Sequence, residues 1–334
     1  MIGYNLSFKM QEYQFIGETI MHKPGQKYRL LTRNDLDGLV CAVLIKHLGI
    51  IESIELVDHP GSIQNRKMPV SGNIISANLP YMDGVHLAFD HHFSETIRNT
   101  EKPGHIIDPD APSAARVVYE YFGGKKTFPS RFDEMMDAVD KADSGNFTKD
   151  EILYPEKWPL LNFLIDKRTG LEDWHDFPLK GEKFGLFMID CMAEMSIDGI
   201  MEQQPVKQRV EIYFKYENSY KNQISRLAEV QQNVLILDFR KTKKVYPGNR
   251  FIPYALFPRC NVSVTIRQDR ENPENVTISA GKSVINRSSS ANIGEIMLSY
   301  GGGGHRAAGA CHVNKGDCER VIAEIIEKLS GSAQ

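Results

Sequence analysis

The chain has 334 residues, of which 41% are hydrophobic and 25% charged, and its formal net charge is −3. This composition excludes disordered, collagen-like and disulfide-scaffold proteins, and the length fits two domains or one large α/β unit. The charge is unevenly distributed, because residues 231–334 carry 14 Lys and Arg against 9 Asp and Glu, a net +5, which leaves −8 for residues 1–230. The split excludes a uniformly basic nucleic-acid coat protein and fits a carboxylate-rich metal site joined to a phosphate-binding lobe.

Cysteine usage and hydropathy indicate the compartment. The five cysteines are an odd number without a CxxC pair, which indicates neither a disulfide framework nor a zinc ribbon. The first residues lack the basic and apolar regions of a signal peptide. The most apolar stretch, residues 39–51, is interrupted by Lys46 and His47 and is shorter than the roughly 20 residues of a membrane span. We therefore predict a cytoplasmic protein with no membrane partner.

The first half of the chain alternates short β-prone runs with helical patterns. A strand over residues 28–31, a polar turn and a helix over residues 39–49 come first, and β-prone runs follow at 51–58, 72–80 and 84–92. Helices are expected over residues 111–121, where a Pro-Ser pair stands near the start, and over 131–142. The alternation predicts an α/β domain with a mainly parallel sheet, whose ligands lie beyond the carboxyl ends of the strands.

The second half begins with a helical segment. Residues 206–230 contain no Gly or Pro and carry an apolar stripe, so we predict a linker helix there. Beyond it, β-rich segments are expected at residues 233–239, 251–257, 260–268 and 275–281, and a helix over 290–305 ends in four glycines. The predicted organisation is therefore a first domain over residues 1–205, the linker helix and a smaller mixed-sheet α/β domain over 231–334.

Two clusters in the first half suit metal chemistry. Asp35 and Asp37 stand two residues apart in the loop after the first strand, where both carboxylates can turn toward one hard divalent ion. Taken alone, this pattern also occurs in ordinary turns. Asp90, His91 and His92 directly follow an apolar run, so that one imidazole can bind metal while the other faces substrate and the carboxylate orients a ring.

Two further clusters come later in the chain. Asp143 precedes a Ser-Gly turn after a predicted helix, and by itself this pattern is typical of a helix end. Four glycines from Gly301 to Gly304, followed by His305 and Arg306, allow backbone amides to approach a ligand and supply a guanidinium for phosphate or carboxylate.

The four clusters, in the order DLDG, FDHH, ADSG and GGGGHRAAG, resemble the DHH phosphoesterase superfamily with a C-terminal DHHA1 domain. The resemblance covers nearly the whole chain and is greatest to exopolyphosphatase-related proteins and short-oligonucleotide phosphodiesterases. It implies a parallel-sheet metal domain, a linker helix, a smaller β-rich substrate domain and two Mn²⁺ ions.

The resemblance also implies roles for particular residues. Asp35 would bind the first metal, whereas Asp37, His91 and Asp143 would bind the second. His92 would contact the scissile phosphate, with Asp90 behind the histidines. The residues expected to hold the phosphate or nucleotide end are Gly302, Gly303, Gly304, His305, Arg306, Arg287 and Ser283.

The sequence departs from the family pattern at two metal ligands. The family usually has a His upstream of the paired aspartates, but the corresponding positions hold Leu31 and Arg33. The family's bridging Asp corresponds to Asn78, which offers a carbonyl oxygen without a charge. We therefore expect one Mn²⁺ rather than two, with Mg²⁺ as the other candidate ion and Asn78 as a fourth ligand. Arg33 would take over part of the electrostatic role of the lost cation.

The predicted function is a phosphoesterase that hydrolyses terminal phosphodiester or phosphoanhydride bonds of short anionic substrates. Oligonucleotides or nucleotides are expected first, and polyphosphate next. The alternative is a non-catalytic nucleotide or oligonucleotide binder that has lost the first metal site. The sequence leaves substrate identity, metal number and the formation of a homodimer open.

Overall fold

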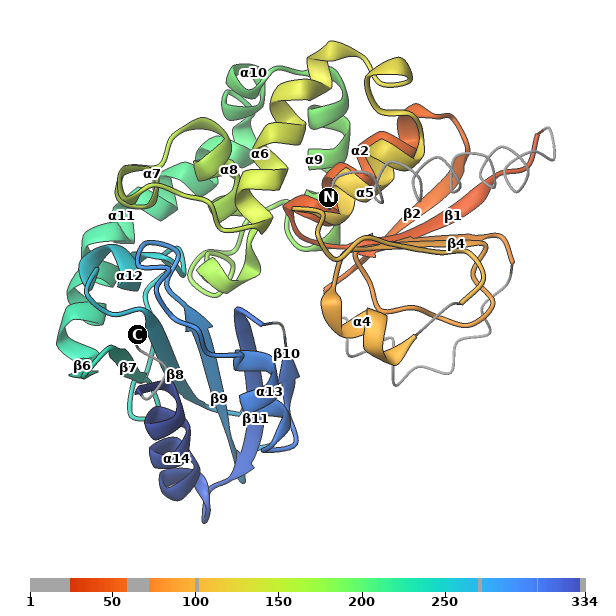
Figure 1. The fold of residues 1–334 in the computed structure, drawn as a ribbon. Coiled ribbons are helices and arrows are strands. Elements are labelled where there is room, and N and C mark those ends of the chain that lie inside the picture. The colour runs from red at the N-terminus through yellow and green to blue at the C-terminus, as the bar shows by residue number, and fades with distance from the viewer. Residues whose placement is uncertain (1–24, 59–71, 100–101, 270–271, 305, 331–334) are drawn as a thin grey trace. The chain divides into compact units, whose positions relative to one another are not determined.

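The computed structural model describes residues 25–58, 72–99, 102–269, 272–304 and 306–330 (Figure 1). The chain divides into two compact units. The first comprises the described residues within Met1–Asn146, Lys157–Asp166 and Asp176–Gln208, and the second those within Phe147–Glu156, Lys167–His175 and Arg209–Gln334. We describe each unit by itself. The domain boundaries at residues 205 and 230 stay a prediction.

The first unit is built on sheet A, a five-stranded sheet whose strands are all parallel, in the order β2-β1-β3-β4-β5. The strands are β1 (Tyr28–Arg33), β2 (Ile51–Val57), β3 (Ile74–Ala77), β4 (Leu87–Asp90) and β5 (His105–Ile107). Every residue of β3 and β4 is buried, which is typical of parallel strands covered on both faces.

Helix α2 (Leu36–His47) connects β1 to β2 and lies at the centre of this unit. Its residues from Leu36 to Ile45 are all buried, because α5 and α9 pack against it from different sides. Figure 1 shows α2, α5 and α9 on one face of sheet A and α4 on the other. The other helices of this unit are α4 (Phe93–Arg98), α5 (Ala114–Tyr121), α6 (Asp133–Asp143), α8 (Lys157–Ile165), α9 (Glu182–Glu194) and α10 (Ile197–Met201), with short 3₁₀ helices at Gly124–Lys126 and Ser130–Phe132.

The strand order reverses at β1. From β1 the chain crosses to β2 on one side, and the next strands, β3 and β4, lie on the other side of β1. A crevice forms at such a switch point because the connections leave neighbouring strand ends in opposite directions. The loops after β1, β3 and β4 therefore meet at the carboxyl edge of the sheet, where the predicted site residues stand.

The second unit is built on sheet B, a six-stranded mixed sheet in the order β10-β11-β9-β8-β7-β6, in which only β7 and β8 pair in parallel. Its strands are β6 (Ala228–Gln231), β7 (Val234–Asp238), β8 (Val262–Gln268), β9 (Asn275–Lys282), β10 (Gly303–Gly304) and β11 (Ala308–Asn314). Its helices are α7 (Lys149–Leu153), α12 (Ile252–Leu256), α13 (Ile293–Leu298) and α14 (Cys318–Ser330), with a 3₁₀ helix at Lys167–Thr169.

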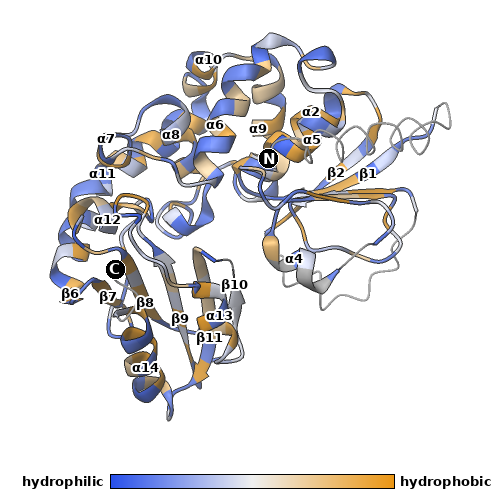
Figure 2. Cartoon of the chain, viewed as in Figure 1, coloured by the Kyte–Doolittle hydropathy of each residue, from blue (hydrophilic) through white to orange (hydrophobic). Residues whose placement is uncertain are grey.

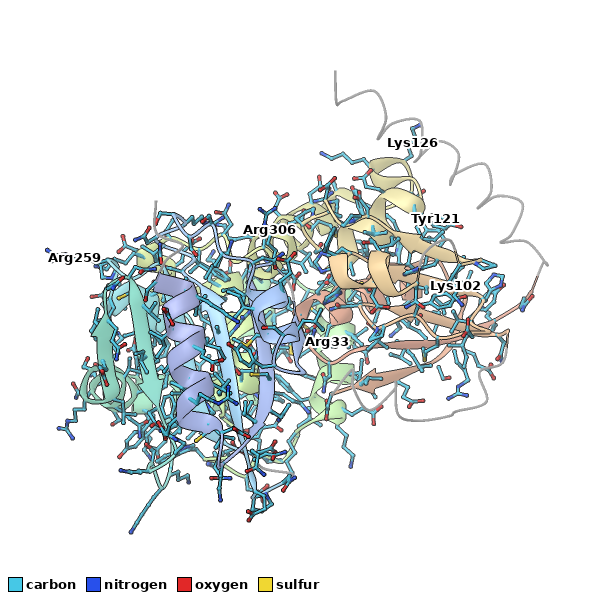
Figure 3. All side chains as sticks on the ribbon, turned by 60° about the horizontal axis from the view of Figure 1, so that its bottom comes forward. Arg33, Lys102, Tyr121, Lys126, Arg259 and Arg306 are labelled. Atoms are coloured by element: carbon cyan, nitrogen blue, oxygen red, sulfur yellow. The ribbon has the colours of Figure 1, made fainter. Side chains whose placement is uncertain are left out.

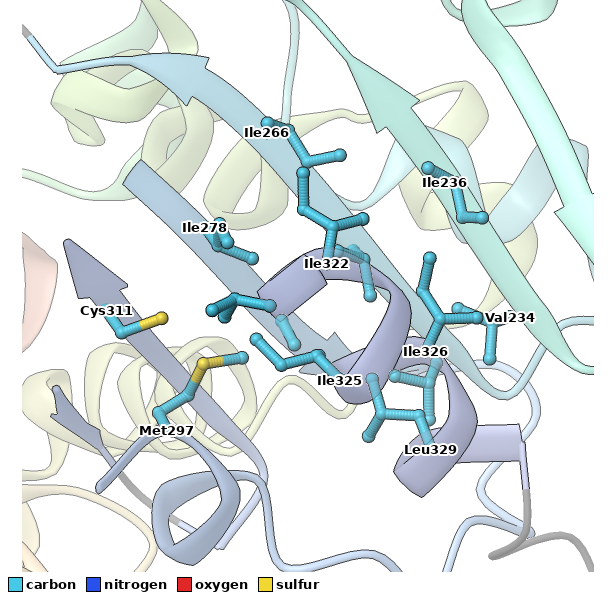
Figure 4. Packing of buried hydrophobic residues seen from close by; sticks show 14 of the residues in the cluster. Val234, Ile236, Ile266, Ile278, Met297, Cys311, Ile322, Ile325, Ile326 and Leu329 are labelled. Carbon is cyan, nitrogen blue, oxygen red and sulfur yellow. The ribbon is translucent and has the colours of Figure 1, made fainter. Parts of the chain in front are cut away.

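Helices α13 and α14 cover sheet B and close its core. Ile322, Ile325 and Leu329 of α14 project between Val234, Ile266 and other strand residues (Figure 4). The apolar and polar residues of α14 alternate along the helix so that only one side is apolar, as the colours of Figure 2 show. This apolar face stabilises a unit whose sheet would otherwise be exposed.

One predicted strand is wrong. Residues 251–257 were expected to be β-rich, but Ile252–Leu256 form α12, with Pro253 in its first turn. A short apolar run fits a buried helix as well as a strand, and proline at the start of a helix loses no intrahelical hydrogen bond. The predicted helix over residues 206–230 is observed as α11 (Gln204–Leu227), and the residues after it form β6, which pairs with β7.

The predicted fold class is confirmed: a parallel α/β unit is followed by a smaller mixed-sheet α/β unit. None of the helices within the described residues is long and apolar enough to cross a membrane. The five cysteines are unpaired and buried.

Candidate active site

The turn between β1 and α2 is fixed by its own sequence. Asp35 caps α2, and its Oδ1 accepts a hydrogen bond from the backbone N–H of Gly38 at 3.1 Å. Thr32 donates to the carbonyls of Gly38 and Ala77. A Cβ on Gly38 would lie 2.0 Å from the carbonyl oxygen of Arg33, so only glycine allows α2 to start this close to β1.

Asp37 lies in the first turn of α2 and is 3% exposed. Its two carboxylate oxygens accept hydrogen bonds from the backbone N–H groups of Ala114 at 3.0 Å and Ala115 at 2.8 Å. These amides belong to the first turn of α5, whose cap is Ser113. The helix start therefore holds the carboxylate in place by hydrogen bonds and by its positive dipole end.

His91 and Asp143 join Asp37 at this point. The Nε2 atom of His91 lies 3.0 Å from Asp143 Oδ2 and 3.9 Å from Asp37 Oδ2. Within the part of the chain that the structure describes, these three side chains form the one cluster of His, Cys, Asp or Glu whose ligand atoms all lie within 4.8 Å of one another. The Nδ1 atom of His91 hydrogen-bonds the carbonyl of Ala111 at 3.1 Å, which directs Nε2 into the cluster.

The electrostatics of the cluster favour positive charge. Burial and the nearby carboxylate of Asp143 raise the pKa of Asp37 to about 7. Burial alone would lower the pKa of His91, but its hydrogen bond with Asp143 and the charge of Asp37 raise that pKa to about 10. Two carboxylates and one imidazole at these distances suit a divalent ion of the Mn²⁺ or Mg²⁺ type, so the residues present fit a metal.

His92 is oriented by the preceding carboxylate. Its Nδ1 atom lies 2.6 Å from Oδ1 of Asp90, which also accepts from the backbone N–H groups of His91 and His92. Burial alone would lower the pKa of His92, but the hydrogen bond to Asp90 and its charge raise it. Asp90 is 1% exposed, and its Oδ2 atom has no hydrogen-bond partner among the described residues. The contact with Asp90 therefore fixes the orientation of the His92 ring.

Asp35 has different neighbours. Its Oδ2 atom forms a salt bridge with Nε of Arg33 at 2.9 Å, and its Oδ1 atom accepts from Nδ2 of Asn78 at 3.1 Å. Arg33 is the last residue of β1 and is labelled in Figure 3. Asp35 is not a member of the cluster formed by Asp37, His91 and Asp143.

Hydrogen bonds from Ser113 and Arg116 to Asp140, which we call the clamp, connect α5 to α6 near this cluster. Asp140 accepts from Oγ of Ser113 at 2.7 Å and from Nε of Arg116 at 2.9 Å. Ser113 caps the helix whose amides hold Asp37, while Asp140 lies one turn before Asp143 on α6. The clamp therefore sets the separation of two side chains that would share a metal.

In the second unit, Lys282 and Arg306 lie near each other at one end of sheet B. The backbone N–H of Lys282 donates to the carbonyl of Ala307, which brings Lys282 and Arg306 together at the ends of β9 and β11. Burial, with the nearby charge of Arg306, lowers the pKa of Lys282. Two neighbouring cationic side chains suit an anionic ligand.

The glycines and their neighbours have structural roles as well. A Cβ on Gly302 would lie 2.1 Å from the carbonyl oxygen of Ala310, and one on Gly304, where φ is +150°, would lie 2.3 Å from that of Ala308. Glycine is thus required for β10 to pair with β11. Ser283 is buried, and its Oγ accepts from the backbone N–H groups of Ile285 and Asn286 in a turn.

Arg287 is exposed and donates to the carbonyl of Val284, while Gly303 lies within β10. The predicted ligand His305 lies outside the described residues. Four groups near the two sites had not been predicted from the sequence: Lys282, Asp140, Arg116 and the carbonyl of Ala111. The Pro-Ser pair before α5 was a signal for the helix start, but nothing local showed that its amides reach Asp37.

Comparison with solved structures gives matches over nearly the whole chain. The pGpG-specific phosphodiesterase PggH from Vibrio cholerae is 47% identical with a TM-score of 0.76, and the match covers 92% of this chain and 100% of that one. No family model and no curated protein sequence matches.

Two more distant structures share the fold. The exopolyphosphatase-related protein from Bacteroides fragilis is 12% identical with a TM-score of 0.52, and the match covers 96% of this chain and 97% of that one. RecJ from Thermus thermophilus, in complex with Mn²⁺, is also 12% identical with a TM-score of 0.52, over 96% of this chain and 55% of RecJ.

Proposed function

The chain belongs to the DHH phosphoesterase superfamily, and on this premise we propose that it is a metal-dependent phosphodiesterase that cleaves short oligonucleotides, with pGpG as its first candidate substrate. The predicted family and the class of phosphoester hydrolase are confirmed by the likeness to PggH. The observation that carries the proposal is the cluster of Asp37, His91 and Asp143, with ligand atoms within 4.8 Å of one another.

The proposed metal is one Mn²⁺ ion, with Mg²⁺ as the alternative. Asp37, His91 and Asp143 would hold it, and their donor atoms suit either ion. A divalent ion at this position supplies positive charge to phosphate oxygens and makes water more acidic. The amides of Ala114 and Ala115 hold Asp37, and the carbonyl of Ala111 holds His91, before the ion binds.

His92 would act on the reacting phosphate. Its ring is held by Asp90 through Nδ1, so that the orientation of Nε2 is fixed by the fold. A protonated His92 donates a hydrogen bond to a phosphate oxygen and stabilises the negative charge that develops there. Asp90 favours this protonated state because its carboxylate lies 2.6 Å from the ring nitrogen.

Lys282 and Arg306 would hold a terminal phosphate of a short substrate. Arg306 is exposed and Lys282 half-buried, and both are cationic. A terminal 5′-phosphate, as in pGpG, offers two negative charges to such a pair, and an internal phosphodiester offers one. This preference supports a short oligonucleotide with a terminal phosphate over a long internal strand.

The test is hydrolysis by the purified chain in Mn²⁺. We expect pGpG to be converted to two molecules of GMP, faster than longer oligonucleotides, cyclic dinucleotides or polyphosphate, as measured by liquid chromatography. The Asp143→Asn variant is the negative control, and Asp137→Asn, an exposed change on the same helix, is the matched positive control. Absence of turnover above Asp143→Asn would overturn the proposal in favour of the non-catalytic binder.

A further inference from the structure

Both oxygens of the Asp35 carboxylate have partners in the chain itself. Oδ1 accepts two hydrogen bonds, from the backbone N–H of Gly38 and from Nδ2 of Asn78, both at 3.1 Å. Oδ2 is bound by Nε of Arg33 at 2.9 Å. A carboxylate oxygen has about two lone-pair directions, so Oδ1 is saturated and Oδ2 already has a cationic partner.

The salt bridge also acts against a metal ion at Asp35. An ion bonded to Oδ2 at roughly 2.1 Å would lie within about 5 Å of the nitrogen of Arg33, where two positive charges repel strongly. Arg33 is always charged, so this repulsion persists at every pH at which the protein is folded. The Arg33 side chain is 29% exposed and that of Asp35 20%, so solvent screens the repulsion only in part.

Asn78, the residue directly after β3, supports the same arrangement. It is 2% exposed and has a φ of 54°, a left-handed conformation that asparagine tolerates better than most residues. Its amide nitrogen is used on Asp35, and its Oδ1 atom has no hydrogen-bond partner among the described residues. An aspartate at this position would place a second negative charge beside Asp35. The amide of Asn78 carries no charge and donates a hydrogen bond to Asp35.

We infer that the guanidinium of Arg33 takes the place of one of the two metal ions of the superfamily. The chain takes a single divalent ion, at Asp37, His91 and Asp143, while Arg33 supplies the second positive charge to the substrate phosphate. Asp35 then positions Arg33 and Asn78 through its salt bridge and hydrogen bond and is not a metal ligand. The inference rests on the proposed function only for the role of Arg33 toward substrate, because the number of ions is independent of activity.

The number of ions is tested on the full chain without substrate. Purified protein is loaded with Mn²⁺, freed of excess ion by gel filtration and analysed by elemental mass spectrometry, and Mn²⁺ binding is followed by calorimetry. We expect one ion per chain for the native protein and for Arg33→Ala. Two ions per native chain, or loss of the ion in Arg33→Ala, would overturn the inference.

The converse variant restores the family ligands. Arg33→His with Asn78→Asp is expected to bind two Mn²⁺ ions, since it returns an imidazole and a carboxylate beside Asp35. The matched control is Arg29→His. Arg29 also lies in β1, but it forms a salt bridge with Glu55 and not with Asp35. The control keeps one ion; a double variant that folds by circular dichroism and still binds one ion would count against the inference.

Turnover separates this inference from the proposed function. We expect Arg33→Ala to lower kcat on pGpG about 10²-fold while its Mn²⁺ content is unchanged, as is typical when one charge that stabilises a transition state is removed. Unchanged kcat in Arg33→Ala would overturn the catalytic part. Inactivity of the native chain with one bound ion would instead contradict the proposed function and leave the metal count standing.

Discussion

Asp35 and Asp37 stand two residues apart at the start of the same helix, yet their surroundings are opposite. Asp35 is neutralised by the chain through Arg33 and the amide of Asn78. Asp37 is held by two helix amides and faces His91 and Asp143. The first carboxylate already has a fixed cation, whereas the second belongs to a cluster that favours positive charge. A motif with two aspartates therefore does not by itself specify two metal ions.

The largest effect is expected from losing a ligand on the Asp37 side. We expect Asp143→Asn to lower Mn²⁺ affinity more than about 10²-fold, since it removes a ligand and not merely a supporting group. Turnover of pGpG at limiting Mn²⁺ should fall by at least the same factor. Calorimetric titration with Mn²⁺ measures the first effect, with Asp137→Asn as the control on the same helix. Equal affinities in the two variants would contradict the assignment of Asp143.

Gly38→Ala would disturb both aspartates at once. The new Cβ would meet the carbonyl oxygen of Arg33 at 2.0 Å, and this contact is relieved only by moving backbone. We expect a loss of about 3 kcal/mol in the free energy of unfolding, at the upper end of the usual cost of overpacking. Denaturant unfolding measures it. Gly199→Ala in α10, where the nearest atoms lie at 3.5 Å or more, is the control and should be neutral or stabilising.

Asp140→Asn would loosen only the support of the Asp37 side and leave the contacts of Asp35 unchanged. The variant weakens the clamp from Ser113 and Arg116, so the start of α5 and the end of α6 are held less firmly. We expect Mn²⁺ affinity to fall about 10-fold to 100-fold, as for other supporting groups at metal sites. At saturating Mn²⁺ kcat should stay close to native. A native Mn²⁺ titration curve would show that the clamp does not position the ligands.

Lys282→Ala should have the smallest effect and leave both aspartates unchanged. It removes one of the two cations at the end of sheet B, so the KM for pGpG should rise about tenfold, within the range for a hydrogen bond to a charged group. The Mn²⁺ content and kcat should be native. Steady-state kinetics across pGpG concentrations provides the measurement, and an unchanged KM would remove Lys282 from the substrate site.

Much of this protein was predictable because the signals are local. The carboxylates and imidazoles after β1 and β4 are placed by strand ends, and the resemblance to the superfamily, carried by four short motifs, put Asp37, His91 and Asp143 together as ligands of one metal. The Arg33 and Asn78 departures from the family pattern were also visible in the sequence. The strand predicted at residues 251–257 was wrong, because a short apolar run does not distinguish a strand from a buried helix.

The sequence by itself determined the family, the parallel and mixed sheets, and the chemical types available at the site. Only the tertiary structure decided which groups meet. Asp37 contacts amides 77 and 78 residues later in the chain, and Asn78 contacts Asp35 across 43 residues. Such contacts depend on the order of strands in the sheet and on how α5 and α6 pack against α2, which are global properties of the fold. The same two aspartates therefore acquire different partners, one an arginine and the other a cluster that suits a metal ion.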